Sequence, residues 1–289
     1  MPTIRIAFVC MLIAIAFTRC KQPSLKKTDR IKKTRLAPKT TGYHFEKYKD
    51  WVKSNGPDSL QQIVLTVNRT DRSNLAKMDS IIVPNDVSGD REFYLPFPLE
   101  IPYIKDINKI LFFSYATQSF GAYEMGELVY TGPSSMGRKA DPTPPGLYYC
   151  NWKAEKTTST FNDEWDLLWN FNIENKLGIG FHQYELPGYP ASHSCLRLQQ
   201  NDARYLYNWA DQWILDEKDE NIVLAKGTPV IVFGSYAFDA PKPWLQLVSD
   251  PKALDFPAAG IQQQVVPFLQ DILSQQQKRD SVISGRVDG

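Results

Sequence analysis

The sequence of 289 residues has little cysteine, little histidine and no excess of charge of one sign. Its 33 Lys and Arg stand against 32 Asp and Glu, so the net charge of +1 does not indicate binding to nucleic acid. Four cysteines cannot form a disulfide scaffold in a chain of this length. With 43% apolar and 12% aromatic residues, the composition is that of a globular protein with one large domain or a main domain and a smaller companion. It excludes a chain that is disordered throughout and a collagen-like repeat.

Long apolar runs are also lacking. The best candidate covers residues 6–17, whereas a transmembrane helix needs about 20 apolar residues. Arg5 precedes this run and Cys20 follows it, and such flanks predict a secretory signal peptide over residues 1–20. We therefore expect export to the cell envelope or periplasm.

Cys20 lies where bacterial lipoproteins carry the cysteine that is acylated after signal cleavage. Those proteins usually have a small residue before the cysteine, and Arg19 departs from this pattern. Two hypotheses follow: a lipid anchor at Cys20, or a simple signal peptide with an incidental cysteine. Residues 21–41 are rich in Lys and Arg and poor in large apolar side chains, which predicts a basic flexible linker.

Residues 42–104 and 237–289 carry no catalytic motif. The first range is expected to form a small α/β region with a short helix and a strand over residues 80–84. Within it, residues 65–84 resemble the second half of LysM glycan-binding modules, and the alternative is a packing subdomain without a ligand. The second range is expected to contain a helix over residues 261–277, followed by a disordered polar tail.

Residues 105–236 have the pattern of a β domain. Strands are predicted over residues 109–115, 119–124, 127–134, 147–152, 167–171, 177–181 and 228–233. The short turns between several of them indicate antiparallel pairing. One helix is expected over residues 201–214, with Asn201 or Gln200 as its cap. The predicted fold class is α+β, mostly β with helices.

Two of the three histidines, His182 and His193, lie shortly before Cys195, and this cluster is the strongest functional signal in the chain. A cysteine is nucleophilic as the thiolate, and a histidine or oriented backbone dipoles lower its pKa from about 8.5. We expect His182 at the end of a strand. The loop that follows contains Pro and Gly and would bring His193 and Cys195 back to it, so that backbone N–H groups face an oxyanion.

The segment PGYPASHSCLRL over residues 187–198, preceded by GIGFH over residues 178–182, closely resembles the active-site segment of bacterial L,D-transpeptidases. Those cell-wall enzymes carry an upstream His followed by a Ser-His-Gly-Cys motif. The resemblance covers roughly residues 107–234 and includes the stretch TPPG at residues 143–146. It implies a mixed β catalytic domain and a cysteine-dependent transfer of peptidoglycan stem peptides. We expect no cofactor.

The resemblance also implies roles for individual residues. Cys195 would be the nucleophile that forms a thioester, and His182 would be the base that deprotonates it. A backbone carbonyl, expected to be that of Gln183, would orient His182. His193 would shape the oxyanion and substrate site together with the N–H groups of Ser194 and Cys195.

Further residues of the segment are assigned to the substrate. Arg197 would hold a substrate carboxylate or support the loop. Substrate contacts are also expected from Ser192, Ser194, Tyr184 and Tyr189. Ser194 departs from the family pattern because it replaces Gly, and a serine would be strained there if the position needs a positive φ.

Alternatives to a transpeptidase remain open. With water as acceptor, the protein would be an L,D-carboxypeptidase or a hydrolase. With a site impaired at Ser194, it would be a cell-wall-binding lipoprotein. A zinc site formed by His182, His193 and Cys195 would lack a good fourth ligand.

A disulfide between Cys150 and Cys195 would block the nucleophile, so Cys150 is predicted to be a free buried thiol. The expected partners are peptidoglycan stem peptides and, through Cys20, a membrane. The sequence leaves the oligomeric state open.

Overall fold

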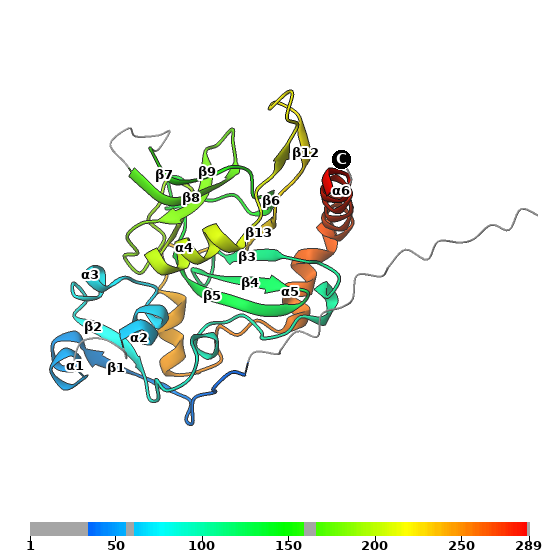
Figure 1. Cartoon of the computed structure of the whole chain (residues 1–289). Coiled ribbons are helices and arrows are strands. Elements are labelled where there is room, and N and C mark those ends of the chain that lie inside the picture. Colours follow the sequence, from blue (N-terminus) through cyan, green and yellow to red (C-terminus); the bar gives the residue numbers. More distant parts are fainter. Residues whose placement is uncertain (1–33, 56–60, 159–165, 288–289) are drawn as a thin grey trace, which may run out of the picture. The chain divides into compact units, whose positions relative to one another are not determined.

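The computed structural model describes residues 34–55, 61–158 and 166–287 (Figure 1). The signal peptide predicted over residues 1–20, Cys20 and most of the predicted linker therefore lie outside the described residues. The described chain from Arg35 onward belongs to one compact unit. No helix of this part has the length and apolar composition needed to span a membrane.

The described strands are β1 (Tyr43–Lys47), β2 (Ser80–Pro84), β3 (Ile110–Ser114), β4 (Ser119–Glu124), β5 (Glu127–Ser135), β6 (Gly146–Tyr149), β7 (Lys153–Thr158), β8 (Asp166–Glu174), β9 (Ile179–Gln183), β10 (Leu196–Leu198), β11 (Ile214–Leu215), β12 (Val223–Ala225) and β13 (Pro229–Phe233). The described α-helices are α1 (Tyr48–Asn55), α2 (Gln61–Val67), α3 (Arg72–Leu75), α4 (Gln200–Trp209), α5 (Ala258–Val265) and α6 (Leu269–Val287). The described 3₁₀ helices are η1 (Arg91–Tyr94), η2 (Pro102–Ile104), η3 (Pro243–Val248) and η4 (Val266–Phe268).

A nine-stranded mixed sheet dominates the fold, in the order β6-β13-β3-β4-β5-β10-β9-β8-β7. Strand β10 joins two groups of strands, because it pairs with β5 on one side and with β9 on the other. The pairs β3–β13 and β9–β10 are parallel, and the other neighbours in this sheet are antiparallel. The α+β fold class predicted from the sequence is confirmed.

The sequence missed two strands of this sheet. β7 is the polar run KAEKTT at the edge of the sheet, where charged side chains are usual because one side of the strand faces solvent. β10 has only three residues. Strands β9 and β10 pair in parallel, because the long loop between them crosses back.

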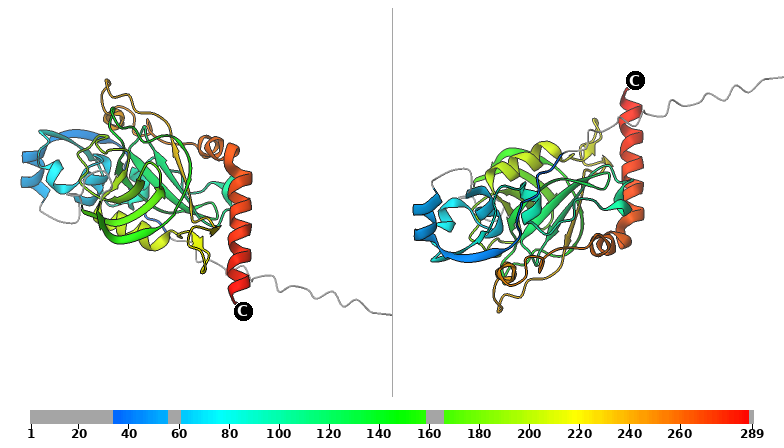
Figure 2. Two further views of the ribbon diagram at one scale, coloured as in Figure 1. Left: turned by 90° about the horizontal axis from the view of Figure 1, so that it is seen from above. Right: turned by 90° about the horizontal axis from the view of Figure 1, so that it is seen from below.

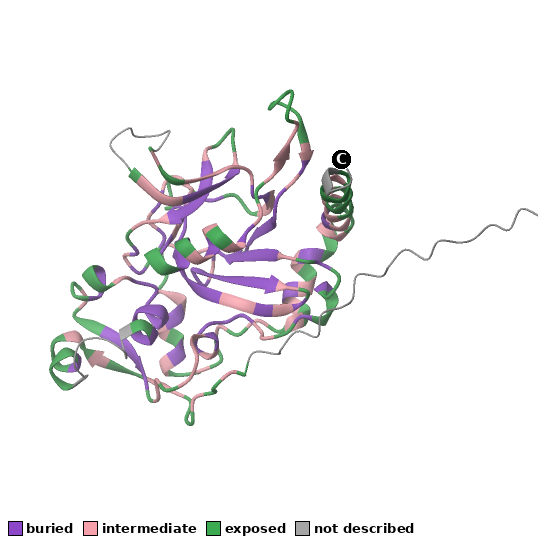
Figure 3. Cartoon of the chain, viewed as in Figure 1, coloured by how far each residue is buried: buried purple, intermediate pink, exposed green. Residues whose placement is uncertain are grey.

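The two faces of the sheet pack into separate cores. Strands β3 and β4 between them are almost wholly buried (purple in Figure 3). Phe113 of β3 faces a core that includes Leu206 of α4. The residue before it, Phe112, points to the opposite face, where the core includes Ile261 of α5 and Ile272 of α6. This alternation follows from the period of two along a strand. The central strands are therefore fixed from both sides.

Helix α4 is shorter than the predicted helix over residues 201–214. It begins at Gln200, after Gln199 in the N-cap position, and no side-chain hydrogen bond caps it. It ends at Trp209, and the N–H of Asp211 donates to the Thr228 hydroxyl at 2.9 Å. This bond to a distant residue takes the place of a further helical turn.

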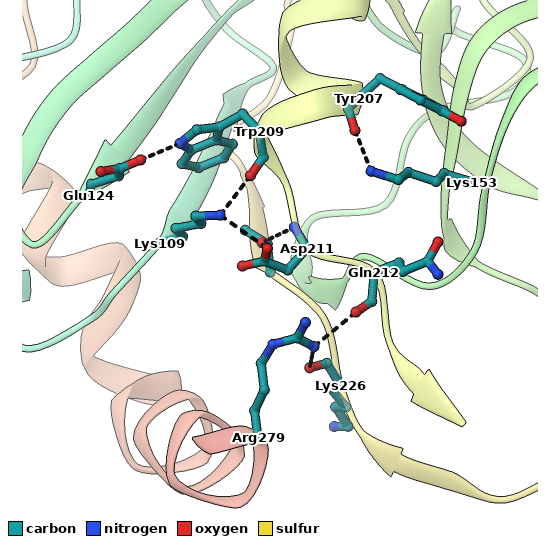
Figure 4. A network of polar contacts seen from close by, with 10 residues as sticks. Lys109, Glu124, Lys153, Tyr207, Trp209, Asp211, Gln212, Lys226 and Arg279 are labelled. Carbon is teal, nitrogen blue, oxygen red and sulfur yellow. Dashed lines mark hydrogen bonds and ion pairs between the residues drawn. The ribbon is translucent and has the colours of Figure 1, made fainter. Parts of the chain in front are cut away.

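The helix predicted over residues 261–277 is divided in the structure into α5, the 3₁₀ helix η4 and α6. Pro267 lies in η4 and has no N–H for a helical hydrogen bond. The expectation of a disordered tail was wrong through Val287, because α6 continues to that residue. Arg279 of α6 donates to the carbonyls of Gln212 and Lys226 at 2.9 and 3.2 Å and so holds the helix to the chain beyond α4 (Figure 4).

The N-terminal region forms around the antiparallel pair β1–β2, and the predicted strand over residues 80–84 is confirmed. Helices α1 to α3 lie between these strands in the chain, and Val64 and Leu75 pack with Ile81 in a small core. In Figure 2 this region, in blue, lies at the opposite end from α6, in red. Whether it is a glycan-binding module stays a prediction.

The end of the predicted flexible linker, residues 35–41, is held in place. The N–H of Leu36 donates to Asp90 at 2.8 Å, and that of Lys39 donates to Asp86 at 2.6 Å. Arg35 donates to the carbonyl of Leu128. The basic segment is ordered here because carboxylates of the following region accept its backbone hydrogen bonds.

Candidate functional site

The register of β9 and β10 brings His182 and Cys195 to one face of the sheet. Leu196 pairs with Phe181, and both side chains are fully buried in the core. Arg197 pairs with His182, and successive side chains of a strand point to opposite faces. His182 and Arg197 therefore face away from that core, and Cys195, one residue before Leu196, belongs to their face.

His182 is held in its neutral form. Its Nδ1 lies 2.9 Å from the carbonyl oxygen of Gln183, which is the contact expected from the sequence. Burial lowers the pKa of His182 to about 4, although the Gln183 carbonyl opposes this effect, and the nearby charge of Arg197 lowers the pKa further. With the Nδ1 proton donated to a carbonyl, the neutral ring leaves Nε2 free of a proton.

Cys195 is a partly exposed thiol whose Sγ lies 3.6 Å from the carbonyl oxygen of Gly178. Burial raises its pKa above the usual value, against the opposing effects of the Gly180 N–H and the charge of Arg197. The sequence had led us to expect a lowered pKa. That expectation was wrong for this state, because the loss of solvent outweighs the stabilising dipole and charge.

The other cysteine within the described residues, Cys150, is a free thiol with 0% exposure, as predicted. Burial raises its pKa well above the usual value. Of the two cysteines that the structure describes, Cys150 is buried and Cys195 is partly exposed.

Ser194 has a φ of 77°, so the position does have the positive φ that strains a serine. Its hydroxyl donates to the carbonyls of Pro142 and Asp141 at 3.2 and 3.3 Å. Its own carbonyl accepts a hydrogen bond from the Thr143 hydroxyl at 2.8 Å. These contacts hold the strained residue against residues 141–143.

Ser192, which was expected to contact the substrate, is only 1% exposed. Its hydroxyl donates to the carbonyl of Cys195 at 2.5 Å, and its N–H donates to the carbonyl of Met136 at 3.0 Å. The serine therefore fixes the turn that carries Cys195, and its side chain points into the protein. The neighbouring His193 is partly exposed, and its Nε2 lies 4.0 Å from a carboxylate oxygen of Asp141.

Arg197 and the two tyrosines lie beside this turn. The guanidinium of Arg197 lies over the ring of Tyr184, 4.4 Å from its centroid. The Tyr184 ring meets that of His182 edge to face at 6.0 Å. Tyr189 is 49% exposed, and Lys242 approaches its ring at 5.6 Å. Arg197, Tyr184 and His182 thus form one cluster, whereas Tyr189 stands at its margin.

Sequence reasoning missed the residues that support the turn from behind. The hydroxyl of Tyr115 donates to the carbonyl of Gly137 at 2.5 Å, and the N–H of Met136 donates to the side chain of Gln118 at 2.7 Å. A Cβ at Gly137 would lie 2.3 Å from the carbonyl oxygen of Asp141, so only glycine fits there. Nothing local in the sequence marks Tyr115 or Gln118 for this role.

The described side chains include no group of three or more His, Cys, Asp and Glu that could hold a metal ion. His182, His193 and Cys195 do not form such a group, which argues against the zinc alternative. The chemistry that the site can perform is therefore that of its thiol, its neutral imidazole and its backbone N–H groups.

Residues 108–232 match the model of the YkuD family, described as the L,D-transpeptidase catalytic domain. This part of the chain is thus similar to L,D-transpeptidase catalytic domains. It extends from before β3 into β13 and contains the turn with His193 and Cys195 as well as His182. A comparison with curated proteins gave no match.

Solved structures of L,D-transpeptidases are similar to less than half of this chain. One from Stackebrandtia nassauensis is 22% identical with a TM-score of 0.36, over 45% of this chain and 57% of that chain. One from Mycobacterium smegmatis is 18% identical with a TM-score of 0.35, over 44% and 59%. L,D-transpeptidase 3 from Mycobacterium tuberculosis is 21% identical with a TM-score of 0.34, over 44% and 62%. The chain thus spans less than two thirds of each of these proteins.

Proposed function

We propose that the protein is an L,D-transpeptidase that acts on peptidoglycan stem peptides through a thioester on Cys195. The observation that carries the proposal is the placement of Cys195 and a neutral His182 on one face of paired strands, within a domain of this family. A neutral imidazole with a free Nε2 is a base, and a partly exposed thiol is the group that it can activate.

In the proposed reaction, Cys195 attacks a carbonyl of the donor stem while the thiol proton moves to Nε2 of His182. The tetrahedral intermediate then collapses, the C–N bond to the terminal D-amino acid breaks, and the imidazolium returns the proton to the leaving amine. The amine of a second stem attacks the thioester and loses its proton to His182, which passes it to the departing thiolate. Atoms, charges and protons balance, and no oxidant or metal takes part.

The turn around Ser194 is proposed to stabilise the oxyanion. The N–H groups of Ser194 and Cys195 are the proposed donors, because hydrogen-bond donors fixed beforehand are worth more than donors that must reorganise. His193 is proposed to complete this site, and Arg197 to hold a substrate carboxylate or to support the loop. The hydrogen bonds of Ser194 to residues 141–143 support a fixed turn.

The experiment that tests the nucleophile is intact-mass measurement after incubation with a carbapenem. We expect one adduct on the wild type and on Cys150→Ala, and none on Cys195→Ala. The Cys150 variant is the matched control, because it removes the buried thiol and leaves the partly exposed one. An unmodified wild type, or an adduct that survives in Cys195→Ala, would refute the proposal.

A second outcome of the same acyl-enzyme is hydrolysis. If water is the acceptor, the protein is an L,D-carboxypeptidase or a hydrolase. Product analysis with a disaccharide-tetrapeptide separates the two, since cross-linked dimers require an amine acceptor, whereas tripeptide alone refutes transfer.

A cell-wall-binding lipoprotein with an impaired site is favoured by one observation, the φ of 77° at Ser194. It predicts binding to murein without a thioester, and an adduct on Cys195 would count against it. We also propose export to the cell envelope, with Cys20 as a lipid anchor. Palmitate labelling of the wild type and of Cys20→Ser tests the anchor, and an unlabelled wild type refutes it.

A further inference from the structure

The loop over residues 184–191, here called the catalytic loop, follows His182 and leads to the turn with Cys195. Within the catalytic domain, backbone hydrogen bonds fix both of its ends. The N–H of Tyr184 donates to the carbonyl of Leu198 at 3.1 Å, and the N–H of Ala191 donates to the carbonyl of Met136 at 2.9 Å.

The middle of the catalytic loop is held by the N-terminal region. The N–H of Leu186 donates to a carboxylate oxygen of Asp71 at 2.6 Å. The carbonyl of Leu186 accepts from the N–H of Asp71 at 3.2 Å and from the Thr70 hydroxyl at 2.8 Å. Thr70 also forms an antiparallel bridge with Pro187. Leu186 itself has 0% exposure and its bond from the Thr70 hydroxyl is buried, whereas its bond to the Asp71 carboxylate is partly buried.

Asp71 is itself firmly placed. It is the N-cap of α3, where its other carboxylate oxygen accepts from the N–H of Asn74 at 2.9 Å and from the Ser73 hydroxyl at 2.7 Å. Burial alone would raise the pKa of Asp71, and the hydrogen bonds from Asn74, Ser73 and Leu186 outweigh it, so that the pKa lies below its usual value. The group is therefore a charged acceptor at neutral pH.

Two further hydrogen bonds connect the residues around Asp71 to parts of the chain outside the catalytic loop. The guanidinium of Arg69 is fully buried and donates to the carbonyl of Thr117 at 2.8 Å. The side chain of Gln199 donates to the carbonyl of Thr70 at 2.8 Å. Because both anchors lie outside the catalytic loop, the segment around Asp71 is a fixed support to which the loop is attached.

A polar groove of about 400 Å³ opens beside this attachment. The N-terminal region contributes Asp71 and Arg72 to its wall, and the catalytic loop contributes Tyr184 and Glu185. Amide side chains line it as well, from Gln62, Gln183, Gln199, Gln200 and Asn201. Amides, carboxylates and a guanidinium are groups that hydrogen-bond the backbone of a bound peptide.

We propose that Asp71 is a positioning residue that holds the catalytic loop in the conformation that binds the stem peptide, so that the N-terminal region completes the substrate site. This inference rests on the proposed function. Asp71 acts through Leu186 and does not touch the thiol. His182 and Cys195 are fixed by β9, β10 and the carbonyl of Gln183, so loss of Asp71 weakens substrate binding and leaves the reactivity of the thiol intact.

The test compares the full-length wild type with Asp71→Ala and Asp71→Asn. The matched control is Asp86→Ala, because Asp86 also accepts the N–H groups of a distant segment but lies away from the catalytic loop. Hydrogen exchange of the peptide containing Leu186 should be at least about tenfold faster in Asp71→Ala and unchanged in the control. Asp71→Asn keeps one oxygen acceptor, so its exchange rate at Leu186 should lie between those of the wild type and Asp71→Ala. This variant also replaces Asp71→Ala in the test if the alanine variant does not fold.

Kinetics then separate positioning from a general loss of structure. In Asp71→Ala, the KM for the donor tetrapeptide should rise about tenfold, whereas kcat and the rate of Cys195 alkylation by iodoacetamide should stay within about twofold. Unchanged exchange at Leu186, or a fall in kcat and alkylation with unchanged KM, would overturn the inference. A wild type without turnover would refute the proposed function alone, because exchange at Leu186 would still support or overturn the role of Asp71.

Discussion

The buried imidazole of His182 makes the stability of the protein depend on pH. Its pKa is about 4 in the folded state and about 6.5 in an unfolded chain. Each pKa unit corresponds to about 1.4 kcal/mol, so the difference amounts to about 3 kcal/mol of the free energy of unfolding. The unfolded chain takes up a proton as the pH falls below 6.5, and the folded protein does so only near pH 4. The contribution is therefore complete above pH 6.5 and is lost progressively down to pH 4.

The assay is urea unfolding of the wild type and of His182→Asn at several pH values between 4 and 7. Asparagine places an N–H donor near the position of Nδ1, which keeps the hydrogen bond to Gln183 and removes the titration. Carboxylates with lowered pKa values, such as Asp71, titrate in both proteins and cancel in the difference. The advantage of the wild type over the variant should shrink by about 3 kcal/mol from pH 7 to pH 4.

Two results would refute this reasoning. The first is a pair of parallel stability profiles for the wild type and His182→Asn. The second is an NMR titration in which the His182 ring has its midpoint near 6.5, because such a ring would be open to solvent and half charged at that pH. Either result would also show that burial does not set the protonation of His182.

Three further predictions concern the thiol, the turn and the core. Alkylation of Cys195 by iodoacetamide should still accelerate above pH 8.5, because burial raises the thiol pKa, and a rate plateau below pH 7 would contradict this. Ser194→Gly should stay within about 1 kcal/mol of the wild type in urea unfolding, since relief of strain offsets the lost hydrogen bonds, while Ser194→Ala should lose about 1 kcal/mol. Equal losses in both would speak against strain at this position. Asp202 is fully buried and accepts from Arg91 at 2.8 Å and Tyr130 at 2.9 Å, so Asp202→Ala should cost about 3 to 5 kcal/mol in the same assay. A loss below about 1 kcal/mol would show that the buried cation does not need its partner.

The site was predictable where its chemistry is local in sequence. His182 and Cys195 are separated by a single loop, and the short pairing of β9 with β10 suffices to bring them to one face. The contact of His182 with the Gln183 carbonyl was expected from the resemblance to L,D-transpeptidases. The effect of burial on the two pKa values was not, since it comes from residues packed around them and not from the motif.

The remainder depends on contacts between distant residues. The sequence near Leu186 does not indicate that its N–H donates a hydrogen bond to Asp71, which lies more than a hundred residues earlier. The end of α4 was misjudged because the partner of Asp211 is Thr228, which no helical pattern reveals. The inward direction of Ser192 likewise follows from its pairing with Met136. The periodicity of apolar residues predicts where a helix or strand forms. It does not predict which distant residue ends that helix or strand.

Strand β10 is the shortest strand of the large sheet. It pairs with β5 through Arg197 and Leu198 and with β9 through those residues and Leu196. The two groups of strands on either side of β10 are therefore connected by the hydrogen bonds of three residues. Cys195 directly precedes these residues in the chain. The pairing of β10 therefore both connects the two halves of the sheet and positions Cys195. A substitution that weakens this pairing would also displace the sulfur atom of Cys195.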